Sequence, residues 1–203
     1  MTHATDKWLI IVRHGETDFN AAGIIQMPAA ALSEQGRGQA ALLANRLADA
    51  GITRIVSSDF PRAADTAAAV SQRTGVAVDH DALLRERDFG DLIGLSYDAF
   101  PSSPLPLDFT PPNGESPDGF FGRMARAWDL ITKLVADTPG NLLVVTHGLV
   151  CKALVSKYVE PTSMGAVPQS WLNTSVTEIS AAAPWVARRV NCVAHLPVQA
   201  RSR

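Results

Sequence analysis

Two histidines occupy matching positions at the ends of two short apolar runs. His14 follows the run 9–12 and His147 follows the run 142–145, each after one intervening residue and each just before a glycine. In open α/β sheets, ligands bind beyond the carboxyl ends of strands, where an imidazole can act as nucleophile, acid, base or metal ligand. We therefore expect both imidazoles at one functional edge. An ordinary hydrogen-bonded rim position is the alternative for each of them.

Two arginines indicate which chemistry these histidines serve. Arg13 directly precedes His14, and Arg62 falls in the first turn of a helix that begins at Pro61. Guanidinium groups and helix N-terminal amides bind tetrahedral anions. A solvated ion pair between Arg62 and Asp65 is the competing interpretation. Combined with the two histidines, the arginines favour a phosphate pocket.

A metal pair at the two histidines is a further alternative. It ranks lower because neither histidine has a carboxylate or thiolate at ligand spacing, and no H-E-x-x-H pattern occurs. The two cysteines, Cys151 and Cys192, are too few for a four-thiolate site or a disulfide framework. We expect neither a metal nor an organic cofactor.

Composition limits the partners. The 203 residues carry a formal net charge of −2, which does not favour general nucleic-acid binding. No run approaches the roughly 18 apolar residues of a membrane helix, and the apolar run 8–12 is too short for a signal peptide. We expect a cytoplasmic monomer or homodimer that binds a small molecule, with no nucleic-acid or membrane partner.

The elements that would position these residues alternate between strand and helix. Apolar and alternating runs predict strands, the last two at sheet edges, over 8–12, 52–57, 76–78, 142–145, 175–180 and 185–190. Helical spacing predicts helices over 33–50, 61–73, from about 118, and from the second histidine through 157. The third helix should bury one side, formed by Phe121, Met124, Trp128, Ile131 and Val135. This alternation predicts an α/β fold, a three-layer sandwich with a mostly parallel central sheet flanked by helices.

We predict a single domain over 1–203. Six of the 13 prolines fall between 101 and 117, a density that excludes regular structure. We interpret the proline-rich segment at about 96–120 as a lid over this domain rather than as a linker.

Four motifs follow one another along nearly the whole chain. They are Arg13-His14-Gly15-Glu16-Thr17 followed by Asn20, Ser57-Ser58-Asp59-Phe60-Pro61-Arg62-Ala63, Glu86-Arg87-Asp88-Phe89-Gly90, and Val145-Thr146-His147-Gly148. Together they resemble the signature of the histidine phosphatase (phosphoglycerate mutase-like) superfamily. The resemblance implies a phosphoglycerate mutase-like fold and favours the phosphatase branch.

The resemblance also implies roles. His14 is the nucleophile that forms a phosphohistidine, and Glu86 is the general acid that protonates the leaving alkoxide. The phosphate oxygens are held by Arg13, Arg62, Asn20 and His147, of which His147 is also catalytic. Further substrate contacts are assigned to Gln26, Phe109 and Glu115. The loop 25–33 departs from the family pattern after Gln26, so a relative's substrate cannot simply be transferred.

Charge in one interval separates hydrolase from mutase. Between Arg87 and Arg123 the chain has no Lys or Arg and six acidic residues. Mutases of the family place basic residues there, whereas an acidic segment repels a bisphosphate primer. We expect hydrolysis of a small phosphomonoester, with a phosphoglycerate mutase-type isomerase or a non-catalytic phospho-ligand binding module as alternatives. The same count predicts a neutral or apolar leaving group, contacted by Leu105, Leu107, Phe109 and Phe120; the alternative is that these four side chains only pack the lid.

Overall fold

A mostly parallel sheet forms the centre of the structure. The structure is a computed structural model that describes residues 7–100, 107–160 and 167–201. Within these ranges the sheet has six strands, in the order β3 (Val78–His80), β2 (Ile52–Ser57), β4 (Asn141–Thr146), β1 (Trp8–Arg13), β5 (Val176–Ser180) and β6 (Ala187–Cys192). The first four strands run parallel, and β5 and β6 pair antiparallel.

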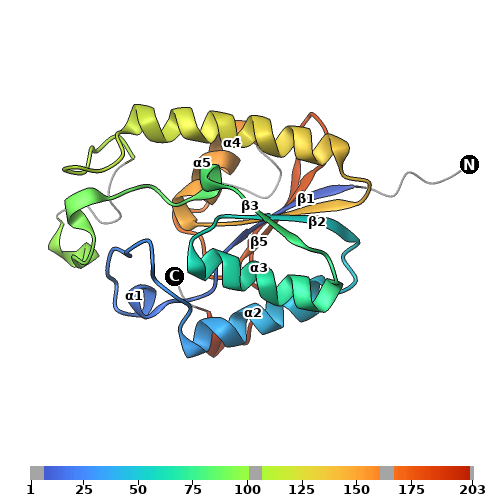
Figure 1. The fold of residues 1–203 in the computed structure, drawn as a ribbon, viewed down its shortest axis with the longest axis horizontal. Helices are drawn as coiled ribbons and strands as arrows, with labels where there is room; N and C mark the ends of the chain where they lie inside the picture. Colours follow the sequence, from blue (N-terminus) through green and yellow to red (C-terminus); the bar gives the residue numbers. More distant parts are fainter. Residues whose placement is uncertain (1–6, 101–106, 161–166, 202–203) are drawn as a thin grey trace, which may run out of the picture.

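Helices cover both faces of this sheet (Figure 1). The helices are α1 (Asp18–Ala21), α2 (Glu34–Leu47), α3 (Pro61–Thr74), α4 (Pro117–Asp137) and α5 (Gly148–Tyr158). Short 3-10 turns lie at Ala82–Leu84, Gly90–Leu92, Tyr97–Ala99 and Val198–Ala200. Helices α2 and α3 lie on one face, and α4 and α5 lie on the other.

Strands β1 and β4 are apolar along most of their length because each face packs against its own core. In β1, Leu9 and Ile11 belong to the core under α4 and α5, whereas Ile10 and Val12 belong to the core over α2 and α3. A strand covered on both sides needs apolar residues at every position. These two cores confirm the three-layer α/β fold.

Local signals fix most helix ends. The Ser33 side chain accepts a hydrogen bond from the Gly36 amide at the start of α2, at 3.0 Å. Helix α3 begins at Pro61 and ends at Thr74, and the next residue, Gly75, has a left-handed φ of 75°. Helix α2 ends at Leu47, three residues earlier than predicted, and α1 was not predicted because it has only four residues.

One strand prediction was wrong. The run 175–180 forms β5, which lies between β1 and β6 and is not a sheet edge. Its alternating polar residues are buried because β6 satisfies them: the Thr177 hydroxyl accepts from the Asn191 amide at 3.1 Å, and Glu178 pairs with Arg188 and Arg189. Only the second predicted edge strand, β6, lies at the edge.

Two smaller corrections concern β3 and α4. Strand β3 begins at Val78, two residues later than predicted. In α4 the buried stripe contains Phe120 rather than Phe121, because residues 120, 124, 127, 128, 131 and 135 recur at helical spacing; Phe121 is only partly buried.

Of the segment at about 96–120, residues 107–116 form no helix or strand, whereas Tyr97–Ala99 form a 3-10 turn and α4 begins at Pro117. Arg87 holds this segment in place: the buried guanidinium donates to the carbonyl oxygens of Leu107 at 3.2 Å, Glu115 at 3.1 Å, and Phe109. Its function as a lid stays a prediction.

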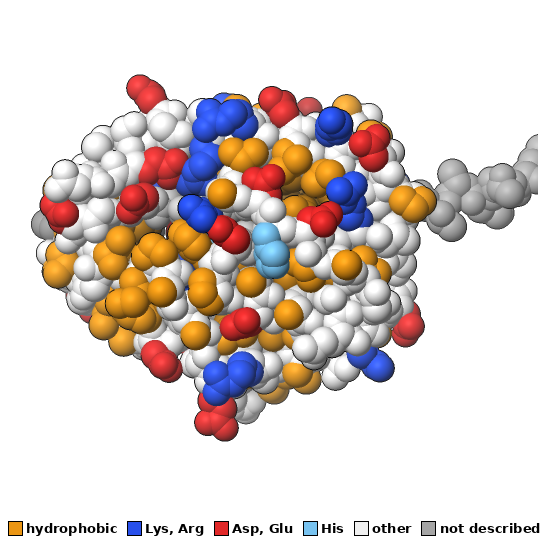
Figure 2. Space-filling view, viewed as in Figure 1, with side chains coloured by type: hydrophobic (Ala, Val, Ile, Leu, Met, Phe, Trp, Pro, Cys, Tyr) orange, Lys and Arg blue, Asp and Glu red, His pale blue; other side chains and the backbone are white. Residues whose placement is uncertain are grey.

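The distribution of charge on the surface is consistent with the small net charge of the sequence. Positive and negative side chains are interspersed over the face shown in Figure 2. Within the described ranges, no helix combines the length and apolar character required to cross a bilayer.

Candidate active site

Sheet topology brings the two histidines together. Strands β1 and β4 are parallel neighbours with Arg13 opposite Thr146, so the next residues, His14 and His147, leave the sheet side by side. Their ring centroids are 5.1 Å apart, and the rings are inclined by 59°. The His14 amide also donates to the Thr146 carbonyl at 2.9 Å, which continues the strand pairing to the histidine itself.

Hydrogen bonding orients the His14 ring. Its Nδ1 lies 2.6 Å from the Gly15 carbonyl oxygen, and because a carbonyl only accepts, Nδ1 must carry the proton. Burial, followed by the nearby Arg62 and Arg13, lowers the pKa of His14 well below its usual range. The ring is therefore neutral at neutral pH, and Nε2 carries a lone pair at the wall of the cavity that His14 lines.

Two buried arginines flank this ring. The Arg13 guanidinium donates to the Trp171 carbonyl, and Arg62 Nη1 donates to the carbonyls of Met27 and Pro28 at 3.2 and 3.3 Å. Burial lowers the pKa of Arg62 to about 10, so it stays cationic at neutral pH. The Nε atoms of both arginines are buried and have no protein partner among the described residues. Two unneutralised cations with unused donors form a receptor for a dianion.

His147 is the second imidazole beside the two arginines. Its Nε2 lies 2.9 Å from the Ser58 hydroxyl, while Nδ1 is buried without a partner in the described part of the chain. Burial, followed by Arg62, lowers the pKa of His147 well below its usual range. When Ser58 donates to Nε2, the neutral ring presents Nδ1–H as a donor to an oxygen beside His14. His147 is fully buried and is not among the residues that line the cavity, although its ring centroid lies 5.1 Å from that of His14, which does line it.

Helix α1 and the loop that follows it place two side-chain amides, Asn20 and Gln26, at the same cavity. Asn20 Oδ1 accepts from the Thr17 amide and from Asn173 Nδ2, both at 3.3 Å, which leaves the Asn20 amide nitrogen as its donor toward the cavity. Gln26 Oε1 accepts from the Thr17 hydroxyl at 2.9 Å. Thr17 thus secures the loop, and Asn173, which also donates to the His14 carbonyl at 3.1 Å, is a contact that sequence reasoning missed.

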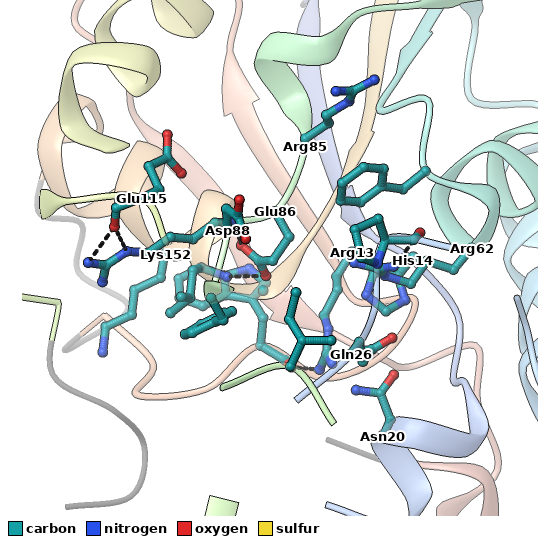
Figure 3. Close-up of a pocket in the computed structure, with 18 of the residues that line it drawn as sticks. Arg13, His14, Asn20, Gln26, Arg62, Arg85, Glu86, Asp88, Glu115 and Lys152 are labelled. Carbon is teal, nitrogen blue, oxygen red and sulfur yellow. Dashed lines mark hydrogen bonds between the residues drawn. The ribbon is translucent and has the colours of Figure 1, made fainter. Parts of the chain in front are cut away.

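Glu86 lies across the cavity from these groups, as Figure 3 shows. Its Oε1 accepts from the Arg87 amide at 3.0 Å, and its Oε2 accepts from the Leu149 amide at 3.1 Å. Arg123 braces the same segment by donating to the carbonyls of Leu83 and Arg85, at 3.0 and 2.7 Å. The carboxyl group is therefore held in one place facing the cavity.

Glu115 and Phe109 have different environments. Glu115 lines the cavity, and its carboxylate accepts from Arg123 at 2.8 and 2.6 Å. Phe109 is exposed and does not line the cavity; only its carbonyl is used, by Arg87. This placement does not support the prediction that Phe109 contacts substrate, because the side chain is exposed and is not among the residues that line the cavity.

The expected apolar leaving-group contacts need a similar correction. Phe120 is fully buried and Leu107 packs against the same core, while Leu105 lies outside the described residues. The cavity, of about 1190 Å³, is lined by other apolar side chains, including Phe60, Phe89 and Ile93, and by cations from other segments, namely Arg85, Arg123 and Lys152. A charge count over one interval missed them because the wall is assembled from distant parts of the chain.

The described residues were also searched for metal-ligand clusters. Across 7–100, 107–160 and 167–201, no three His, Cys, Asp or Glu side chains lie together in a way that could hold a metal ion. The two histidines face arginines rather than carboxylates.

An oriented neutral imidazole lies beside two buried guanidinium groups and a second imidazole, an arrangement that can bind a phosphate group chemically. The sequence profile of the histidine phosphatase superfamily (branch 1) matches residues 9–192, and the chain belongs to this superfamily.

Relatives in this superfamily include both hydrolases and mutase-like proteins. The chain is 35% identical over 184 residues to phosphoglycerate mutase-like protein 4 of Arabidopsis thaliana, covering 83% of this chain and 76% of that protein. It is 34% identical over 205 residues to the metal-independent phosphoserine phosphatase of the same plant, covering 93% and 82%. Its fold matches the structure of mycobacterial glucosyl-3-phosphoglycerate phosphatase with VO3, with a TM-score of 0.76 at 32% identity over 90% of this chain and 96% of that one.

Proposed function

We propose that this protein is a phosphomonoester hydrolase that acts on a small phosphorylated metabolite through a phosphohistidine at His14. The observation that carries the proposal is the state of the His14 ring: Nδ1–H is bound to the Gly15 carbonyl, and the ring is neutral because it is buried near the guanidinium groups of Arg62 and Arg13. A cytoplasmic location, a small-molecule partner and independence from metal belong to the same proposal.

The first step transfers the phosphoryl group to the enzyme. Arg13, Arg62, His147 and Asn20 hold the nonbridging oxygens, where charge spreads in the transition state. His14 Nε2 attacks phosphorus in line, the bond from phosphorus to the ester oxygen breaks, and Glu86 gives its proton to that oxygen. The products of this step are the free alcohol, phosphohistidine and the Glu86 carboxylate.

The second step returns the enzyme to its starting state. A water molecule attacks phosphorus, its proton passes to the Glu86 carboxylate, and the bond from phosphorus to Nε2 breaks with its electrons on nitrogen. Inorganic phosphate leaves, and His14 is again a neutral ring with a lone pair on Nε2. The two steps together consume one water and one phosphomonoester.

The pairing of the cavity cations favours hydrolase over mutase. Arg85 is paired with Asp59, Arg123 with Glu115, and Arg87 is bound to backbone carbonyls. These arginines are therefore already neutralised or engaged, and a bisphosphate primer would find few cations beyond the receptor itself. The relatives named as phosphatases support the same choice, whereas the mutase-like relatives keep isomerisation as the second candidate. A binding module without turnover would have no use for the Glu86 placement.

The test is hydrolysis of an aryl phosphate in a buffer that contains a chelator. We expect wild-type turnover, a loss of about 10³-fold or more in His14→Ala, and no change in His80→Ala, which replaces an exposed histidine. Rapid quenching with labelled substrate should trap acid-labile, base-stable phosphoprotein in the wild type only. With 3-phosphoglycerate and a bisphosphate primer, release of inorganic phosphate supports the hydrolase, and formation of 2-phosphoglycerate would identify a mutase.

A further inference from the structure

A tyrosine that sequence reasoning missed also lines the cavity. Tyr97 is the first residue of the 3-10 turn Tyr97–Ala99, at the start of the segment 96–120. Its ring packs against a small apolar cluster formed by Ile25, Phe89 and Leu92. Because packing holds the ring, the phenol hydroxyl has a defined position at the cavity.

Backbone pairing ties Tyr97 to the loop that follows Asn20. The Tyr97 amide donates to the Gly23 carbonyl at 2.9 Å. Ile24 and Ser96 form an antiparallel bridge between the same two segments. The loop that leads from Asn20 along the phosphate receptor is therefore also the support for Tyr97.

The Tyr97 hydroxyl lies within electrostatic range of both the proposed proton donor and the guanidinium groups. Glu86, Arg13 and Arg62 all act on its ionisation. Burial, followed by Glu86, raises the pKa of Tyr97 to about 12, so the phenol keeps its proton at neutral pH. The cavity thus contains a neutral hydroxyl donor close to the place where phosphate binds.

The proton of this hydroxyl has no acceptor among the residues that the structure describes. Guanidinium groups only donate, so Arg13 and Arg62 cannot accept it. Each carboxyl oxygen of Glu86 already accepts a backbone amide, at 3.0 and 3.1 Å. A phosphoryl group held by the two arginines would bring nonbridging oxygens, which are strong acceptors, to this donor.

We propose that Tyr97 is a further phosphate-binding residue, whose hydroxyl donates a hydrogen bond to a nonbridging oxygen of the phosphoryl group. The proposal rests on the phosphohistidine function proposed above. Through Tyr97, the segment 96–120 contributes directly to the phosphate receptor.

Tyr97→Phe removes the hydroxyl and keeps the ring in its apolar cluster. We expect kcat/KM to fall about tenfold or more, by the same factor for alkyl and aryl phosphates, because all esters share the nonbridging oxygens. A loss confined to alkyl phosphates would place the hydroxyl on Glu86 or on the ester oxygen and would overturn the proposal. The control is Tyr158→Phe, at the other of the two tyrosines, which stacks on Trp128 and is not among the cavity-lining residues. It should retain wild-type values.

Stability separates a lost contact from a loosened structure. In phosphate-free buffer, Tyr97→Phe should have the urea midpoint of the wild type, because the hydroxyl has no partner among the described residues to lose. A lower midpoint would assign the loss of activity to packing and would overturn the proposal.

Binding of inorganic phosphate supplies a readout that needs no turnover. Calorimetry should give a phosphate Kd about tenfold or more higher in Tyr97→Phe than in the wild type, and an unchanged Kd in Tyr158→Phe. A Kd for Tyr97→Phe within twofold of the wild type would overturn the assignment. Tyr97-dependent phosphate binding in a protein that lacks His14-dependent phosphatase activity would defeat the proposed hydrolase and keep Tyr97 as a phosphate ligand. A wild type that binds no phosphate would defeat both proposals.

Discussion

The backbone amide of Leu149 donates to Oε2 of Glu86 at 3.1 Å, across 63 residues of sequence. Leu149 is the second residue of α5, which begins directly after His147. The amides of a helix's first turn have no partner within the helix, so one of them is available to hold the carboxyl group. The backbone of residues 147–149 therefore carries His147 and also holds Glu86 in place. This short segment sets the spacing between the phosphate receptor and the proton donor.

The role of Glu86 as acid predicts a dependence on the leaving group. An alkoxide needs a proton to depart, whereas an activated aryl oxide does not, so Glu86→Gln should slow alkyl phosphates by about 10²–10⁴-fold and aryl phosphates by less than about tenfold. Steady-state kcat/KM for a series of esters measures this difference. Equal slowing across the series would remove Glu86 as the proton donor.

Arg123 should act as a positioning residue for Glu86. Its guanidinium joins Glu115 to the carbonyls of the segment 83–86, so its loss lets the carboxyl group of Glu86 move. We expect Arg123→Met to reduce kcat on alkyl phosphates about tenfold and to reduce kcat on aryl phosphates much less. The matched control is Arg126→Met, an exposed arginine on the same helix. A uniform loss on all esters would indicate general unfolding of the site rather than misplacement of the acid.

Two glycines of α2 should respond to alanine with opposite signs. A Cβ at Gly36 would lie 2.0 Å from the Glu16 carbonyl oxygen, whereas a Cβ at Gly38 meets nothing within 4 Å. Gly36→Ala must push α2 away from the loop that carries His14, and we expect a loss of about 2–4 kcal/mol in the free energy of unfolding together with reduced turnover. Gly38→Ala should raise the free energy of unfolding by about 0.5–1 kcal/mol, because alanine suits a helix interior better. Urea unfolding measures both changes, and destabilisation of similar size in the two variants would contradict the close packing at Gly36.

The buried neutral histidines should make stability depend on pH. The folded-state pKa values of His14 and His147 are depressed by burial, while in the unfolded chain they titrate near 6.5. Below that value the unfolded state binds more protons, so stability is complete above about pH 6.5 and falls as the pH drops further, by about 1.4 kcal/mol per pH unit for each histidine that stays neutral.

The comparison of variants isolates this effect. In phosphate-free buffer, His14→Asn/His147→Asn should lose stability less steeply than the wild type between pH 6.5 and 5. The exposed His80→Asn should retain the wild-type slope. Identical slopes in wild type and double variant would show that the two rings are protonated in the folded protein.

Much of this protein follows from its sequence alone, because the signals concerned are local. Continuous apolar runs identify strands buried on both faces, and Ser33, Pro61 and Gly75 mark helix ends through their own backbone and side-chain chemistry. Each of two such strands is followed by a histidine, and this pattern already predicts that the two histidines meet at one edge of the sheet. Glu86 was assigned through family resemblance only, since a carboxylate within a run of charges has no distinguishing local signal.

Tertiary structure alone decided the character of the substrate cavity. The position of β5 inside the sheet depends on partners that β6 supplies, and the exposure of Phe109 depends on the anchoring of its segment by Arg87. Ion pairs between residues distant in sequence, such as Arg85 with Asp59, determine which cations remain available to a substrate. A count of charges along the chain does not reveal these pairs. Coulombic pairing and burial act through space, so the sequence determines the phosphate receptor at the strand ends, while the folded wall determines which leaving group that receptor serves.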